Sequence, residues 1–211
     1  MDFLSAIKSI AGEECIFCNE MMSDHTTFKV GGPAKYFVVP YRAEDIKKYI
    51  LAAEEYKIPY YVIGNGSNLL VSDKGYDGMI IMLGRDLGNI TVNGDRITAE
   101  AGTSLARLFN TARRHSLSGL EFAAGIPGTL GGACYMNAGA YGGEMKDVLT
   151  KVVTIDRQGN THEYKQGEME LSYRNSIFIR KQEIILSAEM KLCKGDVEKM
   201  THKVNELLEN M

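Results

Sequence analysis

The sequence lacks the features that mark several broad classes of protein. No apolar run approaches the roughly 18 residues of a membrane span, and no basic stretch followed by a long apolar core opens the chain, so no secretory signal is predicted. Lysine and arginine number 24 against 27 aspartates and glutamates, which gives a net charge of −3 and no basic excess that would indicate nucleic acid. Internal repeats and low-complexity tracts are also missing. A soluble globular protein of one or two domains is the class that remains.

Cysteine is scarce as well, with four residues in a chain of 211. This content does not make a disulfide framework at such a length. Cys15 and Cys18 have C-x-x-C spacing, but a structural zinc site needs four ligands, and Cys134 and Cys193 are single and distant. The histidines are scattered, so no metal site is predicted. We expect reduced thiols, as in a cytoplasmic protein, with a redox or metal role of the C-x-x-C pair as the alternative.

Hydrophobic periodicity predicts an α+β fold with two subdomains that face one another. Helical spacing of apolar residues predicts helices over residues 3–10, 43–56, 105–112 and 196–211. Short β-type runs predict strands at residues 36–39, 59–63, 69–71, 79–82, 90–92, 96–99, 152–155, 161–164 and 184–188. Asn93 and Gly94 indicate a tight hairpin turn, and Thr103 or Ser104 is expected to cap a helix. We divide the chain into subdomains at residues 1–84 and 85–195, followed by an amphipathic helix at 196–211 that begins with Asp196 as its cap.

One glycine-rich loop lies between two predicted strands, at Gly64, Asn65, Gly66, Ser67 and Asn68. It is not the dinucleotide fingerprint, which needs a third glycine and a helix directly after it, and no lysine follows as in a Walker loop. A strand–loop–strand of small residues can still form a nest of backbone amides for a pyrophosphate. An ordinary tight turn is the alternative. If the loop binds phosphate, Gly66→Val is expected to empty the site without unfolding the chain.

A second glycine-rich segment is longer, with seven of the 22 glycines between Gly125 and Gly143. Pro127 fixes one backbone angle, and Thr129 can cap a short helix whose N-terminus favours an anion. Room for close approach comes from three further glycines, Gly128, Gly131 and Gly132. Glycine is costly in ordinary structure, so purely structural turns are rarely this long. Two such loops indicate one long cofactor, such as a dinucleotide, held between the subdomains.

Arg174 is the candidate for anion recognition outside the glycine loops. It lies in residues 171–178, which mix polar and apolar side chains without clean periodicity. A planar guanidinium can hold a substrate carboxylate through two hydrogen bonds, and a structural arginine on a surface loop is the alternative. Arg113, Arg114 and His115 end a predicted helix, where their charge complements the helix dipole. A phosphate-binding role is the alternative for that group.

Four ordered motifs resemble one family of flavoenzymes. They are residues 25–34 (HTTFKVGGPA), 62–70 (VIGNGSNLL), 119–129 (GLEFAAGIPGT) with its continuation to 142, and 172–178 (SYRNSIF). The family that they resemble is the UDP-N-acetylenolpyruvoylglucosamine reductases of bacterial cell-wall synthesis (UDP-N-acetylmuramate dehydrogenases, MurB). The resemblance spans roughly residues 20 to 190. Other flavoproteins with the same FAD-binding architecture share the glycine loops but not the Ser-Tyr-Arg-Asn-Ser motif.

The resemblance implies a non-Rossmann FAD-binding fold of the PCMH/VAO-like type, with FAD between two α+β subdomains. By the family pattern, Arg174 stabilises negative charge on an enol carboxylate, and Tyr173 lines the same pocket. The residues implied in cofactor binding are Gly64, Asn65, Gly66, Ser67, Asn68, Ala124, Gly125, Ile126, Pro127, Gly128, Thr129, Gly131, Gly132, Asn137, Gly139, Ala140, Tyr141 and Gly142. The loop at 64–68 and the turn at 125–129 would hold the pyrophosphate, and residues 137–142 would lie along the flavin.

The implied activity belongs to peptidoglycan precursor synthesis. NADPH reduces FAD, and hydride then passes to the enolpyruvyl group of UDP-N-acetylglucosamine enolpyruvate to give UDP-N-acetylmuramate. We expect a cytoplasmic monomer with a UDP-sugar substrate and with neither nucleic acid nor membrane as a partner. Family members carry a further C-terminal domain that binds the UDP-sugar and supplies a serine acid and a late glutamate. Neither motif occurs before Met211, and the helix from Asp196 is expected to lead into that domain.

Two other functions stay open at this stage. The first is a FAD-binding fragment without turnover, because the motifs of the C-terminal domain are missing from this sequence. The second is an oxidoreductase on the same FAD fold that acts on a different substrate.

Overall fold

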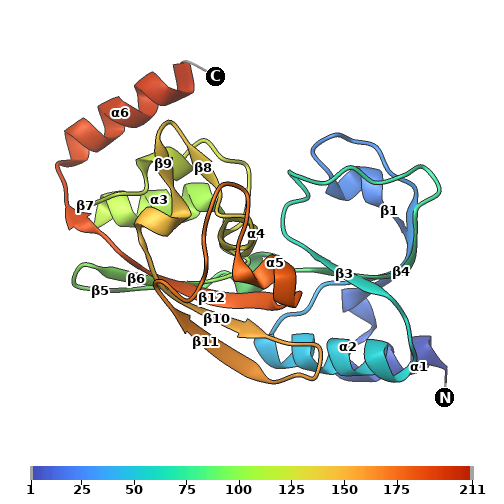
Figure 1. Cartoon of the computed structure of the whole chain (residues 1–211). Coiled ribbons are helices and arrows are strands. Elements are labelled where there is room, and N and C mark those ends of the chain that lie inside the picture. Colours follow the sequence, from blue (N-terminus) through green and yellow to red (C-terminus); the bar gives the residue numbers. More distant parts are fainter. Residues whose placement is uncertain (1, 210–211) are drawn as a thin grey trace.

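Two β-sheets, each with its own helices, make up the protein, and the computed structural model describes residues 2–209 (Figure 1). The first sheet has the strand order β1-β2-β4-β3. Strands β2 and β3 both run parallel to β4, and β1 is antiparallel to β2. Helices α1 and α2 pack against each other beside this sheet. The bounds are α1 (Phe3–Ala11), β1 (Ile16–Met21), β2 (Pro33–Val38), α2 (Ala43–Glu55), β3 (Tyr60–Ile63) and β4 (Tyr76–Met82).

The second sheet is antiparallel throughout, in the order β11-β10-β12-β6-β5. Helix α4 packs on β12, and α6 packs beside α3. The bounds are β5 (Ile90–Asn93), β6 (Arg96–Glu100), α3 (Leu105–Arg114), α4 (Leu130–Tyr135), β10 (Leu149–Ile155), β11 (Thr161–Lys165), α5 (Ile177–Lys181), β12 (Ile184–Lys191) and α6 (Val197–Glu209). Two pairs of very short strands complete this half: β7 (Leu117–Ser118) with β13 (Cys193–Lys194), and β8 (Gly139–Ala140) with β9 (Gly143–Glu144).

Local sequence signals explain several of these elements. Gly94 has a φ of 61° in the tight turn between β5 and β6, as the Asn-Gly pair predicts. Ser104 caps α3, and its hydroxyl accepts a hydrogen bond from the Arg107 amide at 3.3 Å. The apolar residues of α3 then face inward, and Leu105 and Leu108 are fully buried. The predicted hairpin and the predicted cap are therefore confirmed.

Helix α6 also begins where the sequence predicts. The Asp196 carboxylate accepts hydrogen bonds from the amides of Glu198 and Lys199 at 2.9 and 3.2 Å. Met200 and Val204, predicted for the apolar face, are buried. Leu208 and Met211, predicted for the same face, lie outside the described side chains.

The strand predicted at residues 69–71 is wrong. This segment has no regular structure, and Leu70 is 73% exposed. Both sides of β4 are already occupied by β2 and β3, so no place is left beside it. The segment instead contacts the loop that precedes β2, where the Gly32 amide donates to the Ser72 carbonyl at 2.9 Å.

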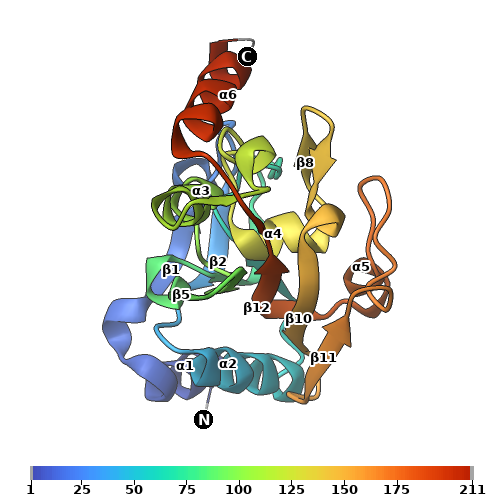
Figure 2. The same cartoon turned by 90° about the vertical axis from the view of Figure 1, so that its left-hand side faces the viewer.

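The two halves share one apolar core, which joins Val38 and Ile50 of the first half to Ile97 and Leu108 of the second. The tip of the β10–β11 hairpin strengthens this union (Figure 2). A Cβ placed at Gly159 in that tip would lie 3.1 Å from the Lys47 side chain on α2. The sheets are therefore fixed side by side by packing that crosses from one half to the other.

No described helix is long and apolar enough to cross a membrane. The described residues also hold no group of three histidine, cysteine, aspartate or glutamate side chains arranged for a metal ion. All four cysteines are free thiols: Cys15 and Cys134 are buried, whereas Cys18 and Cys193 are exposed.

Candidate functional site

A cleft with a volume of about 640 Å³ lies between the two sheets. The first half lines it with residues 60–69 and 83, and the second with residues 105, 126–129, 131–133, 135, 136, 138, 139, 157, 174, 179 and 182–185. Both glycine-rich segments therefore meet in one cleft, although they are far apart in the sequence.

The loop at residues 64–68 directly follows β3 and is held by backbone contacts. Gly66 has a φ of 61°, and its carbonyl accepts a hydrogen bond from the Thr27 amide at 3.2 Å. A Cβ at Gly66 would lie 1.9 Å from the His25 carbonyl oxygen. A valine there would collide with backbone rather than with a bound cofactor. The expectation that Gly66→Val leaves the fold intact is therefore wrong.

This loop lines the cleft and has unused backbone donors. Within the described part of the chain, the amides of residues 64–68 donate no hydrogen bond to another protein group. Ser67 and Asn68, which also line the cleft, add a side-chain hydroxyl and a carboxamide. Successive free amides in a turn form a concave site for an anion. The geometry is thus compatible with a pyrophosphate.

The second glycine segment behaves differently, because the amides at the start of its helix are already bonded. Thr129 caps α4 as predicted. The first three amides of that helix have protein acceptors: Leu130 donates to the Thr103 carbonyl at 2.8 Å, Gly131 to the Ala101 carbonyl at 2.9 Å, and Gly132 to the Thr129 hydroxyl at 3.5 Å. The helix start therefore supplies room for a ligand rather than free donors, contrary to the expectation of an anion site there.

The two segments touch each other at the middle of the cleft. A Cβ at Gly64 would lie 2.2 Å from the Thr129 hydroxyl oxygen, so only glycine fits at this crossing. Near it, a Cβ at Gly128 would stand 3.8 Å from the Ser67 hydroxyl, which is ordinary contact. A Cβ can thus be accommodated at Gly128 in the cleft, whereas Gly64 is closed off by packing.

Arg174 reaches the cleft from the loop that precedes α5. Its Nη2 donates a hydrogen bond to Asn68 Oδ1 at 3.1 Å, and Asn68 Nδ2 lies 3.8 Å from the Met136 sulfur. Arg174 itself has a φ of 53°, in the left-handed region that few side chains adopt. Asn68 therefore connects the first glycine loop to the candidate catalytic arginine.

Asn137 supports the arginine loop from behind. It is buried, its Nδ2 donates to the Ser172 carbonyl at 3.0 Å and to the Glu144 carboxylate, and its Oδ1 accepts from the Lys146 amide at 2.9 Å. A separate hydrogen bond, from the Lys146 side chain to the Glu144 carboxylate, holds the pKa of Glu144 below its usual range, and the bond from Asn137 adds to this lowering. Every polar group of the Asn137 side chain is thus engaged within the protein.

Several predicted site residues do not line the cleft. Ala124, Gly125, Asn137, Ala140, Tyr141 and Gly142 flank it instead. Tyr173, predicted for the pocket of Arg174, is 91% exposed. The β8–β9 hairpin, which carries residues 139–144, projects beyond the sheet (Figure 1). The roles of these residues in cofactor binding or catalysis stay predictions.

The cleft also contains residues that the sequence did not single out. Arg157 lies in the β10–β11 turn, and its guanidinium carbon is 5.6 Å from the centre of the Tyr60 ring. It donates to Gln182 Oε1 at 2.8 Å and lies 3.7 Å from the Glu54 carboxylate. Burial raises the pKa of Tyr60, and Arg157 acts against that shift. The sequence carries no signal for this group beyond the hairpin turn itself.

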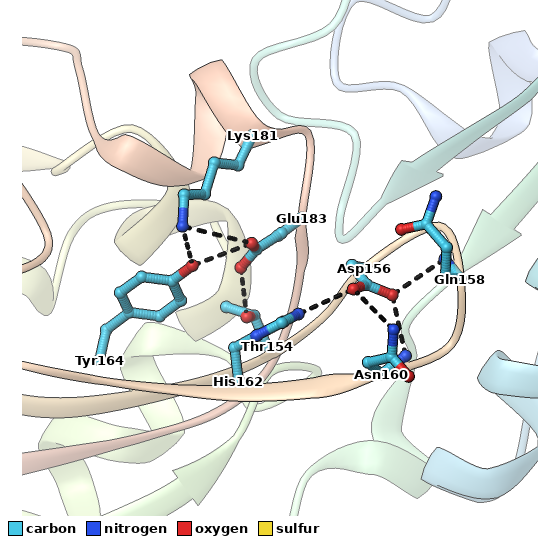
Figure 3. A network of polar contacts seen from close by, with 8 residues as sticks. All are labelled: Thr154, Asp156, Gln158, Asn160, His162, Tyr164, Lys181 and Glu183. Carbon is cyan, nitrogen blue, oxygen red and sulfur yellow. Dashed lines mark hydrogen bonds and ion pairs between the residues drawn. The ribbon is translucent and has the colours of Figure 1, made fainter.

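Asp156 fixes the turn that carries Arg157 (Figure 3). Its carboxylate accepts hydrogen bonds from the amides of Gln158 and Asn160 at 2.9 and 2.8 Å, and lies 2.8 Å from His162 Nε2. The contact with His162, followed by these amides, lowers the pKa of Asp156 to about 2.

Glu183 fixes the neighbouring start of β12 (Figure 3). This buried carboxylate accepts hydrogen bonds from the hydroxyls of Thr154 at 2.5 Å and Tyr164 at 2.9 Å. Lys181 donates to the same tyrosine oxygen at 2.8 Å. Both carboxylate oxygens are thus satisfied, and the turn from α5 into β12 is tied to β10 and β11.

The fold is that of proteins built on a FAD-binding domain. A family model described as "FAD binding domain" matches residues 34–165. Two solved structures show the same fold at low identity. Phl p 4, a grass pollen allergen with glucose dehydrogenase activity, is 14% identical with a TM-score of 0.68, over 93% of this chain and 45% of that one. An alkyldihydroxyacetonephosphate synthase is 17% identical with a TM-score of 0.68, over 91% of this chain and 40% of that one. The predicted α+β fold of the FAD-binding type is confirmed.

Relatives of higher sequence identity show to which family of such proteins the chain belongs. The UDP-N-acetylenolpyruvoylglucosamine reductase of Alkaliphilus oremlandii is 41% identical over 99% of this chain and 70% of its own length. That of Caldanaerobacter subterraneus is 46% identical over 95% of this chain. The crystal structure of the Thermus caldophilus enzyme (MurB) is 35% identical, with a TM-score of 0.78 over 90% of this chain and 67% of that one. The chain belongs to the UDP-N-acetylenolpyruvoylglucosamine reductase family.

The match extends along nearly all of this chain but not along all of the relatives. The chain spans 66% of the Caldanaerobacter protein and 64% of the Syntrophomonas wolfei protein.

Proposed function

We propose that the cleft binds FAD and that the protein acts as a flavin-dependent reductase in peptidoglycan precursor synthesis. NADPH would be the hydride donor, and the substrate would be UDP-N-acetylglucosamine enolpyruvate, reduced to UDP-N-acetylmuramate. The observation that carries the proposal is the meeting of the free amides of residues 64–68 with Arg174 in one cleft.

The residues present fit FAD. The free amides of residues 64–68 provide donors for the pyrophosphate, and Gly128 and Gly132 provide room opposite them. The lining of the cleft also includes Arg174 and Tyr60. A volume of about 640 Å³ lies within the usual range of ligand sites, roughly 300–1,000 Å³. Bound FAD supplies the hydride chemistry.

In this proposal, Arg174 recognises the substrate carboxylate. A guanidinium has five N–H donors, and Asn68 takes a bond from only one of its nitrogens. Reduction of the enolpyruvyl double bond builds negative charge toward that carboxylate, and a fixed cation stabilises it most where the charge grows. Asn68 and Asn137 hold the arginine loop, so the guanidinium needs little rearrangement when the charge develops.

The first test is the visible absorption spectrum of the purified chain before and after denaturation. We expect a flavin spectrum, or its appearance on titration with FAD, and release of FAD on unfolding. Anaerobic NADPH should then bleach the spectrum, and the UDP-sugar should restore it. A protein that stays colourless and takes up no FAD would contradict the whole proposal.

Cofactor binding and turnover can be separated by a second measurement. Steady-state NADPH oxidation should depend strictly on the UDP-sugar. In a form of the protein that turns over, Arg174→Ala should retain FAD and lose at least about a hundredfold in kcat, because a transition-state charge loses its partner. FAD binding without UDP-sugar-dependent oxidation would overturn the reductase part and leave the binding part standing. Near-normal turnover of Arg174→Ala would remove this residue from the mechanism.

A further inference from the structure

The pair Asn65-Gly66 lies in the middle of the loop at residues 64–68, and the fold requires its glycine. A Cβ at Gly66 would lie 1.9 Å from the His25 carbonyl oxygen, so no other residue fits there without a shift of the backbone. Asn65 is exposed, and within the described part of the chain its carboxamide has no hydrogen-bond partner. The loop therefore holds a free asparagine directly before an obligatory glycine.

An asparagine in this position can lose its side-chain amide by reaction with its own backbone. The Gly66 nitrogen attacks Cγ of Asn65, so that the N–Cγ bond forms, the Cγ–Nδ2 bond breaks, and ammonia leaves with the proton of the Gly66 amide. Water then opens the resulting five-membered succinimide at either carbonyl, which gives aspartate or isoaspartate. Glycine favours the attack because it has no Cβ in the way and adopts backbone angles that other residues avoid.

The attacking nitrogen is unbonded in this structure. Among the described residues, the Gly66 amide donates no hydrogen bond, whereas its carbonyl accepts one from the Thr27 amide at 3.2 Å. Gly66 is buried, so the loop must loosen before the ring can close. An anion that accepts hydrogen bonds from the loop amides would occupy the nitrogen and hold the loop in one conformation. The reaction is therefore expected in the empty loop and is opposed when the loop is occupied.

We propose that Asn65 is a deamidation site that bound cofactor protects, and that the deamidated chain binds the cofactor weakly. The inference rests on the proposed function, because it takes the ligand of this loop to be the pyrophosphate of FAD. Deamidation replaces a neutral carboxamide with a carboxylate, whose negative charge repels a pyrophosphate at the same loop. The empty protein thus loses its binding capacity with time, whereas the protein that holds FAD keeps it.

A second Asn-Gly pair provides an internal control. Asn93 and Gly94 lie in the exposed turn between β5 and β6, where Asn93 pairs with Arg96 across the hairpin. Neither residue of this pair lines the main cleft. Asn-Gly occurs at no other place in the sequence. FAD should therefore leave deamidation at Asn93 unchanged.

The experiment is incubation of the whole chain in mildly alkaline buffer, with and without saturating FAD, followed by tryptic digestion and mass spectrometry. Trypsin places the two sites in different peptides, residues 58–74 and 86–96. We expect FAD to slow deamidation at Asn65 by at least about tenfold, because it depletes the empty form, and to leave the rate at Asn93 unchanged. Equal slowing at both sites would show general stabilisation and would overturn the proposal.

Substitutions test the consequence for binding. Asn65→Asp reproduces one product of the reaction and should raise the Kd for FAD by at least about tenfold. Asn65→Ser cannot form the succinimide and should keep its initial affinity throughout the incubation. Asn93→Asp adds the same charge on the β5–β6 turn and is the matched control, with an unchanged Kd. Wild-type affinity in Asn65→Asp would overturn the proposal.

The outcomes separate this inference from the proposed function. Freshly purified wild type, shown by its mass to have Asn65 intact, is the reference for FAD binding. Its failure to bind FAD would refute the proposed function itself. FAD binding by this protein without protection of Asn65 would overturn the inference and leave the proposed function standing.

Discussion

At the scale of single residues, the glycines of the cleft fall into two kinds. Gly64 and Gly66 are required by the fold itself, because a Cβ at either would collide with Thr129 or with the His25 carbonyl. Gly128 and Gly132 are packed less tightly, and an added Cβ at either would make only ordinary contacts, with no atom nearer than 3.7 Å. A substitution at Gly128 or Gly132 can therefore test for a bound ligand without disturbing the fold, whereas a substitution at Gly64 or Gly66 cannot.

Gly128→Ala is therefore the substitution that tests the cofactor space. We expect the Kd for FAD to rise by about tenfold, because the methyl group occupies room that a closely approaching ligand needs. The melting temperature of the apoprotein should hardly change. Gly84→Ala is the control, since its Cβ would also meet nothing nearer than 3.8 Å, and Gly84 lies outside the main cleft. Unchanged FAD affinity in Gly128→Ala would show that the ligand does not pass this residue.

Asp156 gives a pH dependence whose sign follows from its contacts. The folded protein lowers its pKa from 3.8 to about 2, so folding favours the ionised form. The stabilisation is complete above about pH 4 and is lost as pH falls toward 2. The wild type should be more stable than Asp156→Asn at pH 5, and the difference in melting temperature should shrink by pH 2. Asp73→Asn, a change at an exposed aspartate, is the control, and a difference independent of pH would contradict the assignment.

At the scale of elements, local signals predicted much of the structure. The β5–β6 hairpin and α3 were predicted because their turn, cap and apolar spacing all lie within a few consecutive residues. Strand β1 was missed because it lies at a sheet edge and is largely exposed on both faces, so its residues do not alternate. Helix α5 was missed because it has five residues and depends on Ile177 and Phe178 docking into the core.

The residues of the cleft also divide into those that local patterns mark and those that only long-range packing brings together. The loop at 64–68 and Arg174 could be found from residue types, because glycine density and a family motif mark them. Arg157 and Gln182 could not, because they enter the cleft only when the β10–β11 hairpin docks against the other half. That docking joins segments about a hundred residues apart, and no local pattern encodes it.

Helix α3 offers a test of capping. Ser104→Ala removes the acceptor of the Arg107 amide and should cost about 1 kcal/mol, lowering the melting temperature by roughly 2–4 °C. Ser9→Ala on α1 is the control, because the exposed Ser9 hydroxyl bonds only to the Ala6 carbonyl within the same helix. Thermal denaturation followed by circular dichroism measures both. Equal effects of the two variants would contradict the role of Ser104 as the cap.

At the scale of the whole molecule, one core crosses from the first sheet to the second. We therefore expect a single cooperative transition in calorimetry, with equal calorimetric and van't Hoff enthalpies. FAD at a hundred times its Kd should add about 2.7 kcal/mol to the free energy of unfolding, which raises the melting temperature by roughly 5–10 °C. Two separate transitions, only one of them shifted by FAD, would show that the halves unfold independently.

The two exposed thiols give a way to measure the spacing between the two halves. Cys18 on β1 and Cys193 on β13 are exposed, one on each half, whereas Cys15 and Cys134 are buried, and burial raises the pKa of both buried thiols. Maleimide dyes or nitroxide spin labels should therefore attach at only two positions of the unaltered chain. The unaltered protein therefore has one labelling site on each half. Resonance energy transfer or pulsed spin resonance between the two labels could then follow the spacing of the halves as flavin is added.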